Sequence, residues 1–194
     1  IRQLPPNLGV VTSIQHLHKA RDVATKIQAR LAGQVLGCRT ESADRIADQV
    51  DGFLFIGTGR FHPIAVALHT RKEVYCYDPK ARSLSKITKE EIEQFRLHRK
   101  AAIVRYLASQ RIGILISTKS GQNLFQKAQA FLEKHKNDSK EYYLFAFETL
   151  HLPWLEHYPF VQCWINTACP RIADDTTGIA NMDDILEFEK NGDY

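Results

Sequence analysis

Short runs of β-branched and aromatic residues alternate with amphipathic helical stretches along most of the chain, and this alternation constrains the fold more than any other feature. Strands are predicted at residues 7–12, 34–36, 53–56, 74–77, 112–117, 142–147 and 160–165. Helices are predicted at residues 17–32, 43–50, 64–69, from Thr88 onward, at 124–135 and at 182–190. Strands that alternate with helices form right-handed βαβ units, so the pattern predicts an α/β fold built on parallel sheets.

The strand–helix pattern restarts after the long helix that begins near Thr88, which predicts two similar α/β units. Two pairs of segments share element order and residue types, namely 10–17 with 116–124 and 53–63 with 163–172. We therefore predict two domains, which cover residues 1–105 and 106–194.

Composition excludes several classes of protein. With 194 residues, 44% hydrophobic and 25% charged, the chain has a soluble globular composition. No apolar run reaches the roughly 18 residues of a membrane span, and the start lacks the apolar stretch of a signal peptide. The net charge of +4 is spread along helices, so no nucleic-acid surface is expected. Four cysteines without a CxxC pair indicate reduced thiols in a cytoplasmic protein. Because residue 1 is Ile, we expect a processed form or a fragment.

The densest polar cluster of the sequence is Asn166-Thr167-Ala168-Cys169-Pro170-Arg171-Ile172-Ala173-Asp174-Asp175, directly after a buried strand. Ligands of such folds sit beyond the carboxyl ends of the strands. An Arg beside a cysteine favours the thiolate, which is both a nucleophile and a metal ligand. Arg171 is alternatively suited to a bidentate contact with an anionic group. The competing interpretation is an Arg–Asp ion pair that closes the loop.

Three other strand-end loops carry candidate groups. Cys38 follows Gly37 just after a short strand and is either a buried structural thiol or a functional one. His62, in Gly57-Thr58-Gly59-Arg60-Phe61-His62-Pro63, is either an active-site group or a helix cap. The loop 117–122 suits an anion but lacks a complete phosphate-binding motif. Cys76 and Cys163 lie inside strands and are expected in the core, and the scattered histidines do not indicate zinc.

The blocks GQVLGC at 33–38, IGTGRFHP at 56–63, STKSGQ at 117–122 and NTACPRIADD at 166–175 occur in an order that resembles the diphthamide synthase family, the 2-(3-amino-3-carboxypropyl)histidine synthases. The resemblance covers nearly the whole chain. It implies a repeat of three α/β domains, each of which gives one cysteine to a central [4Fe-4S] cluster. Cys38 then corresponds to the ligand of the middle domain and Cys169 to that of the last.

The resemblance also implies a reaction. The reduced cluster gives one electron to the sulfonium of S-adenosylmethionine, and the resulting 3-amino-3-carboxypropyl radical adds to a histidine of translation elongation factor 2. Arg171 and Gln122 are candidates to hold the carboxylate and amino group of the methionine portion, and His62 and Gln15 are weaker candidates. A homodimer or a heterodimer with a related subunit, an electron donor and a cytoplasmic location are further implications.

Two departures from the family pattern stand out. Thr58 occupies the place of an Asp in the GDGRFH loop, and no part of the sequence matches the first cysteine-bearing domain. The leading hypothesis is therefore an iron–sulfur transferase or its two-domain piece. One alternative is a non-catalytic α/β subunit that supports a cluster on a partner chain, and another is an unrelated S-adenosylmethionine or nucleotide binder.

Overall fold

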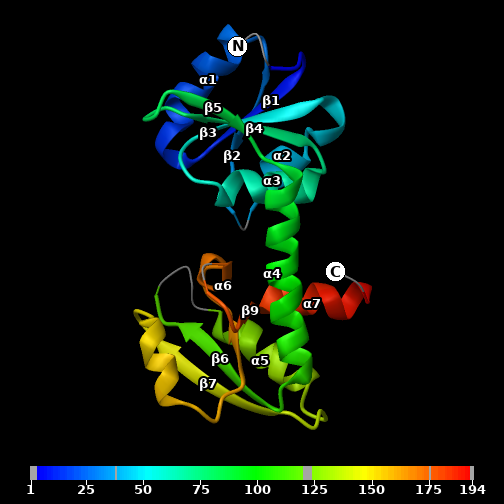
Figure 1. Cartoon of the computed structure of the whole chain (residues 1–194), viewed down its shortest axis with the longest axis vertical. Coiled ribbons are helices and arrows are strands. Elements are labelled where there is room, and N and C mark those ends of the chain that lie inside the picture. The colour runs from blue at the N-terminus through cyan, green and yellow to red at the C-terminus, as the bar shows by residue number, and fades with distance from the viewer. Residues whose placement is uncertain (1–3, 38, 120–123, 175, 193–194) are drawn as a thin grey trace. The chain divides into compact units, whose positions relative to one another are not determined.

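The computed structural model describes residues 4–37, 39–119, 124–174 and 176–192, and these form two compact units (Figure 1). Unit 1 spans residues 1–94 and unit 2 spans residues 95–194. The boundary lies inside one long helix, whereas the sequence placed it after residue 105. The second half of the helix packs in unit 2, since Tyr106 is buried in the core cluster there and Ala102 packs against the same cluster.

Unit 1 is a five-stranded sheet in the order β2-β1-β3-β4-β5, with four parallel strands and an antiparallel β5. Its strands are β1 (Leu8–Thr12), β2 (Arg30–Gln34), β3 (Gly52–Ile56), β4 (Glu73–Asp78) and β5 (Ser83–Lys86). Its helices are η1 (Ile14–His16), α1 (Leu17–Lys26), α2 (Glu41–Asp44), η2 (Ala47–Gln49), α3 (Phe61–Thr70) and the first turns of α4 (Lys89–Ala108).

Unit 2 is a four-stranded parallel sheet in the order β7-β6-β8-β9. Its strands are β6 (Arg111–Ser117), β7 (Glu141–Phe147), β8 (Cys163–Asn166) and β9 (Ile179–Asn181). Its helices, besides the rest of α4, are α5 (Phe125–Lys134), η3 (Leu152–His157), α6 (Arg171–Asp174) and α7 (Met182–Asn191).

The two sheets confirm the predicted repeat. In each unit the first strand lies between the second and the third, and the fourth lies outside the third. The segments that the sequence paired occupy corresponding places in the order of elements. Segments 10–17 and 116–124 run from the first strand toward the first α-helix of each unit, and segments 53–63 and 163–172 run from the third strand into the next helix. The fold class is therefore α/β, with two repeated parallel-sheet units.

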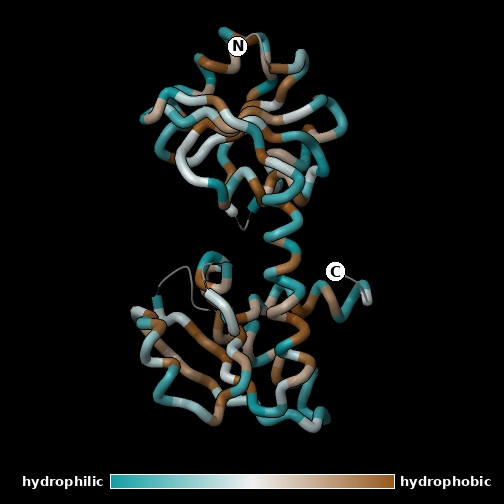
Figure 2. Tube along the Cα trace, viewed as in Figure 1, coloured by the Kyte–Doolittle hydropathy of each residue, from teal (hydrophilic) through white to brown (hydrophobic). Residues whose placement is uncertain are grey.

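The core of unit 2 shows why its strands are so apolar. In β6, Ile112, Ile114 and Ile116 face a cluster that includes residues of α4, α5 and α7, while Leu115 faces the side covered by η3 and α6. A strand covered on both faces must be hydrophobic at every position. Figure 2 shows hydrophobic residues concentrated on the strands of each unit. Gly113 completes the second face, because a Cβ there would overlap the ring of Trp164.

The predicted helix 17–32 is too long, and Gly33 does not follow its end. The helix stops at Lys26, Gln28 takes a left-handed conformation with φ of 54°, and the chain continues directly into β2. Gly33, with φ of 116°, lies at an irregularity where the β1–β2 register shifts. A bulge of this kind favours glycine, because a side chain is strained at positive φ.

Candidate functional site

The polar block at residues 166–174 begins at the last residue of β8 and forms a tight turn, of which Asn166, Thr167 and Ala173 are buried. The Asn166 side chain donates one hydrogen bond to the Cys169 carbonyl oxygen and another to Asn181 Oδ1, both at 2.9 Å, and its own Oδ1 accepts from the Ala168 N–H at 3.0 Å. The Thr167 hydroxyl donates to the Leu115 carbonyl oxygen of the neighbouring strand at 2.8 Å. These bonds hold the turn against the carboxyl end of the sheet.

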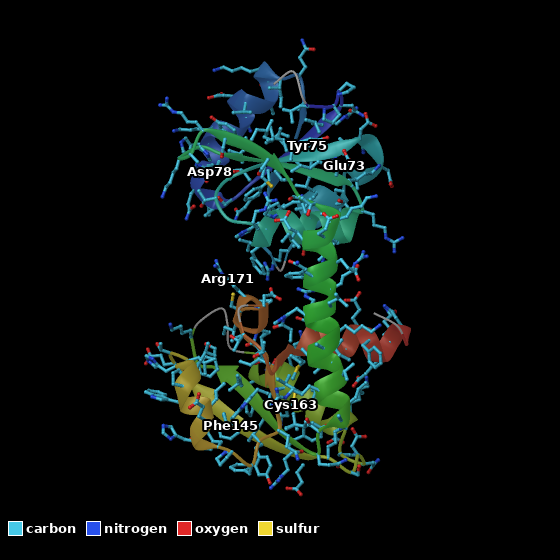
Figure 3. The ribbon with its side chains drawn as sticks, in the orientation of Figure 1. Glu73, Tyr75, Asp78, Phe145, Cys163 and Arg171 are labelled. Atoms are coloured by element: carbon cyan, nitrogen blue, oxygen red, sulfur yellow. The ribbon has the colours of Figure 1, made fainter. Side chains whose placement is uncertain are left out.

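Cys169 is exposed at the tip of this turn and lines a pocket of about 380 Å³. The pocket is bounded by Lys119, Phe147, Glu148, Thr149, Leu150, Leu152, Cys169, Arg171, Ile172 and Thr176. It therefore combines one thiol, two cations, one carboxylate and an apolar wall. Figure 3 shows Arg171 at the start of α6.

An arginine of α4 pairs with the aspartate near the end of this block. Arg99 of α4 lies 3.7 Å from Asp174 Oδ1 and 3.2 Å from Asp184 Oδ1 of α7. The neighbouring His98 contacts the Ala173 carbonyl oxygen at 2.9 Å. Helix α4 therefore anchors the turn, while Arg171 lines the pocket with Cys169.

The two cysteines predicted to lie in the core are buried. Cys76 lies in β4 and Cys163 in β8, and burial raises the pKa of these thiols to about 11 and about 12 respectively. Such thiols stay protonated near neutral pH and are poor metal ligands, because the thiolate is the form that binds metal. Figure 3 shows Cys163 among the strands of unit 2.

In unit 1 the predicted residues Gln15 and His62 lie at the same end of the sheet, after the neighbouring strands β1 and β3. Gln15 is exposed within η1. His62 is partly buried in α3, and its ring stacks on Phe55 with centroids 6.0 Å apart and an interplanar angle of 13°. The two loops approach closely, since a Cβ on Gly57 would lie 3.3 Å from the Ser13 hydroxyl.

Arg60 has a structural role in the GTGRFHP loop. Its guanidinium donates to both carboxylate oxygens of Glu91, at 2.8 and 2.6 Å, and to the Ser85 hydroxyl and the Lys86 carbonyl oxygen. The bond to Glu91 raises the pKa of Arg60, and the same bond lowers the pKa of Glu91. The loop that carries His62 is thus tied to β5 and to the start of α4.

Two of the predicted site residues, Cys38 and Gln122, lie outside the described residues. Gly37, which precedes Cys38, is buried, and a Cβ on it would overlap the ring of Phe61, so the chain at Gly37 packs against the start of α3. The roles assigned to Cys38 and Gln122 remain predictions.

Sequence reasoning missed several residues of this site. Lys119 and Glu148 line the pocket, and Asn166, Asn181 and Arg99 organise the turn. Lys119 and Asn166 belong to segments that the sequence singled out, so their positions at strand ends were a usable signal. Asn181 and Arg99 lie far away in sequence and gave none.

An iron–sulfur cluster needs accessible thiolates. Cys169 is exposed at its turn, whereas Cys76 and Cys163 are buried and burial raises the pKa of their thiols. Within the described ranges no group of three or more His, Cys, Asp or Glu side chains is placed to hold a metal ion. Unit 2 therefore fits a cluster as the source of one ligand rather than as a complete site. The same ranges hold no helix with the length and apolar character needed to cross a bilayer.

The fold and the site define a protein of repeated α/β units with a solvent-facing cysteine in a cationic strand-end pocket. Residues 2–179 match the family model described as "Putative diphthamide synthesis protein". The chain belongs to this family. Membership overturns the interpretation as an unrelated nucleotide binder.

Curated relatives and solved structures agree with the family match. The chain is 30% identical to the 2-(3-amino-3-carboxypropyl)histidine synthase of Pyrococcus horikoshii over 92% of this chain and 54% of the relative. It is 33% identical to that of Methanocaldococcus jannaschii over 94% of this chain and 48% of the relative. The crystal structure of Dph2 from Pyrococcus horikoshii with a 4Fe-4S cluster superposes with a TM-score of 0.85 and 26% identity, over 100% of this chain and 60% of that chain. The chain spans about half the length of the curated relatives it matches.

Proposed function

We propose that this chain acts in the first step of diphthamide biosynthesis, as all or part of an iron–sulfur transferase. It would transfer the 3-amino-3-carboxypropyl group of S-adenosylmethionine to a histidine of translation elongation factor 2. One observation carries the proposal: Cys169, the solvent-facing thiol among the described cysteines, shares its pocket with Arg171 in a chain of this family. The Pyrococcus relative that holds a 4Fe-4S cluster supports it.

The residues of the pocket suit this chemistry. Cys169, after the third strand of unit 2, would ligate one iron, and Cys38, which follows the second strand of unit 1 in sequence, would supply a second ligand. When bound, the reduced cluster would supply one electron to the sulfonium of S-adenosylmethionine, so that the bond from sulfur to the γ-carbon breaks.

The protein's own contribution is to hold and shield the substrate. Arg171 would bind the methionine carboxylate through two parallel N–H donors, with Lys119 as a second cation in the same pocket. Phe147, Leu150 and Ile172 form an apolar wall that would exclude water from the reacting bond. Gln122 is a candidate for the amino group, and His62 and Gln15 are weaker candidates from unit 1.

The proposal also includes the partners and the location of the protein. Its protein substrate would be translation elongation factor 2, and an external donor would supply the electron. The chain would form a homodimer, or a heterodimer with a related subunit, in the cytoplasm. The basic residues behind the net charge of +4 are spread along the helices, so we propose no direct contact with nucleic acid.

A second candidate is a non-catalytic subunit that supports the cluster of a partner chain. One observation favours it: among the described cysteines a single thiol, that of Cys169, is exposed, which suits a chain that contributes one ligand to a partner's cluster. Anaerobic incubation with iron and sulfide separates the candidates. A stable cluster on the isolated chain supports the transferase, and iron uptake only in the presence of a related chain supports the subunit.

Transfer of label from S-adenosylmethionine carrying ¹⁴C in its carboxyl carbon to translation elongation factor 2 tests the proposed reaction. The reconstituted chain is assayed alone and with a related subunit. Label on the histidine in either assay supports the proposal. Absence of label in both, when a full-length family member labels the same substrate, contradicts it.

A further inference from the structure

We propose that Asn166 is a positioning residue for Cys169, held by a buried polar chain that runs through Asn181 and Asp184 to Arg99. The inference rests on the proposed function, since it concerns how the thiol of that site is presented. Asn166 is 2% exposed and Asn181 4% exposed, so both amides lie inside the protein.

The Asn166 amide is used in full. Its two N–H protons go to Cys169 and Asn181, and its oxygen accepts the Ala168 N–H. The amide therefore spans the turn from within and fixes the carbonyl group of the residue that carries the thiol. A buried amide satisfied in this way resists movement, because any displacement leaves a polar group unpaired.

Asn181 fixes the Asn166 amide in turn. Its Oδ1 accepts from Asn166, and its Nδ2 donates to Asp184 Oδ2 at 3.3 Å. Asp184 is 7% exposed and lies 3.2 Å from the guanidinium of Arg99. Arg99 also approaches Asp174, so that both ends of the polar block 166–174 are tied to the same arginine of α4.

The side chain of Cys169 is not enclosed by the turn that carries it. Cys169 is exposed, and the Pro170 carbonyl oxygen accepts from the Ala173 N–H at 3.0 Å, which closes the short helix α6 behind it. The restraint on Cys169 thus comes from beneath the turn, through the backbone, and leaves the sulfur open on the pocket side.

Asn166→Asp is a sharp test, because it keeps the shape and replaces two donors by a carboxylate oxygen that faces two acceptors. Asn166→Ala and Asn181→Ala provide further variants that remove a link without adding charge. Asp183→Asn is the matched control. Asp183 is next to Asp184 in sequence, but it is exposed and pairs with Lys127, so it is not a member of the buried polar chain from Asn166 to Arg99.

The first readout is alkylation by iodoacetamide in the protein without cluster, followed cysteine by cysteine by mass spectrometry. Cys163 reports opening of unit 2 as a whole, because it is fully buried in the same strand that leads to Asn166. We expect the alkylation rate of Cys169 to rise at least threefold in the Asn166 and Asn181 variants, with Cys163 and the Asp183→Asn control unchanged. A Cys169 rate within twofold of wild type in all three variants, or an equal rise at Cys163, would overturn the inference.

The second readout is loss of the reconstituted cluster to an iron chelator, for which we expect at least a fivefold faster rate in Asn166→Asp. If wild-type protein assembles no cluster, alone or with a related chain, the proposed function fails while the alkylation result still decides the role of Asn166. If wild type assembles a cluster and the variants retain it as well as wild type does, the positioning role fails and the proposed function stands.

Discussion

The described cysteines of this chain lie in sharply different environments. Cys76 and Cys163 are buried in strands, and Cys169 is exposed at a turn. Burial disfavours the charged thiolate, which is why the pKa values of the buried pair are raised. Burial thus places a thiol in the core and, by keeping it protonated, makes it a poor metal ligand.

Iodoacetamide should therefore label Cys169 at pH 8 and leave Cys76 and Cys163 unmodified. Raising the pH to 9.5 should leave the buried pair unmodified as well, because their pKa values of about 11 and about 12 keep them protonated. Peptide mapping by mass spectrometry measures each site, and unfolding in urea should make all sites reactive. Rapid labelling of Cys163 in the folded chain would contradict the account.

Gly37 is required by its contact with an aromatic ring rather than by its backbone angle. A methyl group there would overlap Phe61, so we expect Gly37→Ala to destabilise the chain by about 1–3 kcal/mol, the usual cost of overpacking. Urea unfolding measures the loss. The double variant with Phe61→Leu should recover part of it, and strictly additive effects of the two substitutions would contradict the contact.

The loop 57–60 illustrates how one element depends on another. Arg60 binds Glu91, and Glu91 also accepts from the Thr88 N–H at 2.8 Å while Thr88 Oγ1 accepts from the Glu91 N–H at 3.2 Å. These reciprocal bonds form a capping box at the start of α4. One carboxylate thus begins the helix and fixes the loop before α3.

Arg60→Lys should destabilise unit 1 by about 1 kcal/mol, because lysine cannot form the two-pronged contact and both partners are partly exposed. The loss should shrink in acid. The pKa of Glu91 is lowered in the folded chain, so its contribution is present above the ordinary carboxyl pKa and disappears as pH falls through the lower, folded value. Thermal unfolding at pH 7 and pH 3 measures this, and an equal loss at both values would contradict it.

Elements differed in how far the sequence revealed them. Apolar runs such as 53–56 and 112–117 were predictable, because parallel strands covered on both faces have no polar position to confuse the pattern. The exposed edge strand β5, the three-residue β9 and the four-residue α6 were missed, since they are too short to show a period. Residues 30–32, which begin β2, were assigned to a helix, because their pairing with β1 is a tertiary effect that local propensity does not record.

For the site, the sequence located the turn and its thiol but not the supports beneath it. Cys169 and Arg171 lie two residues apart in a conspicuous block, and both line the pocket. Asn181 and Arg99 reach that block only through the fold. Long-range polar contacts of this kind leave no local pattern.

Arg171→Ala should weaken S-adenosylmethionine binding by about tenfold or more, since a charged hydrogen-bonded contact contributes roughly 1.5–3 kcal/mol. Arg111→Ala is the matched control, because Arg111 begins β6 and so lies at the opposite end of the same sheet. Isothermal titration of the reconstituted protein measures both. Unchanged affinity in Arg171→Ala would remove this residue from the proposed binding site.

At the scale of the whole molecule, two units repeat one strand order, and each offers a loop with a cysteine at a strand end: Cys38 by sequence in unit 1 and Cys169 by structure in unit 2. Under the proposed function, the ligands of one cluster would come from strand-end loops far apart in sequence, and each unit would supply one of them.

The most direct test of this account is electron paramagnetic resonance. The chain is first incubated anaerobically with iron and sulfide and then reduced by dithionite. If the isolated chain takes up no iron, a related family member is added. The account predicts a reduced-cluster signal that is abolished or strongly altered in Cys38→Ala and in Cys169→Ala and is unchanged in the matched control Cys76→Ala. A signal of full intensity and unchanged shape in Cys169→Ala would contradict it.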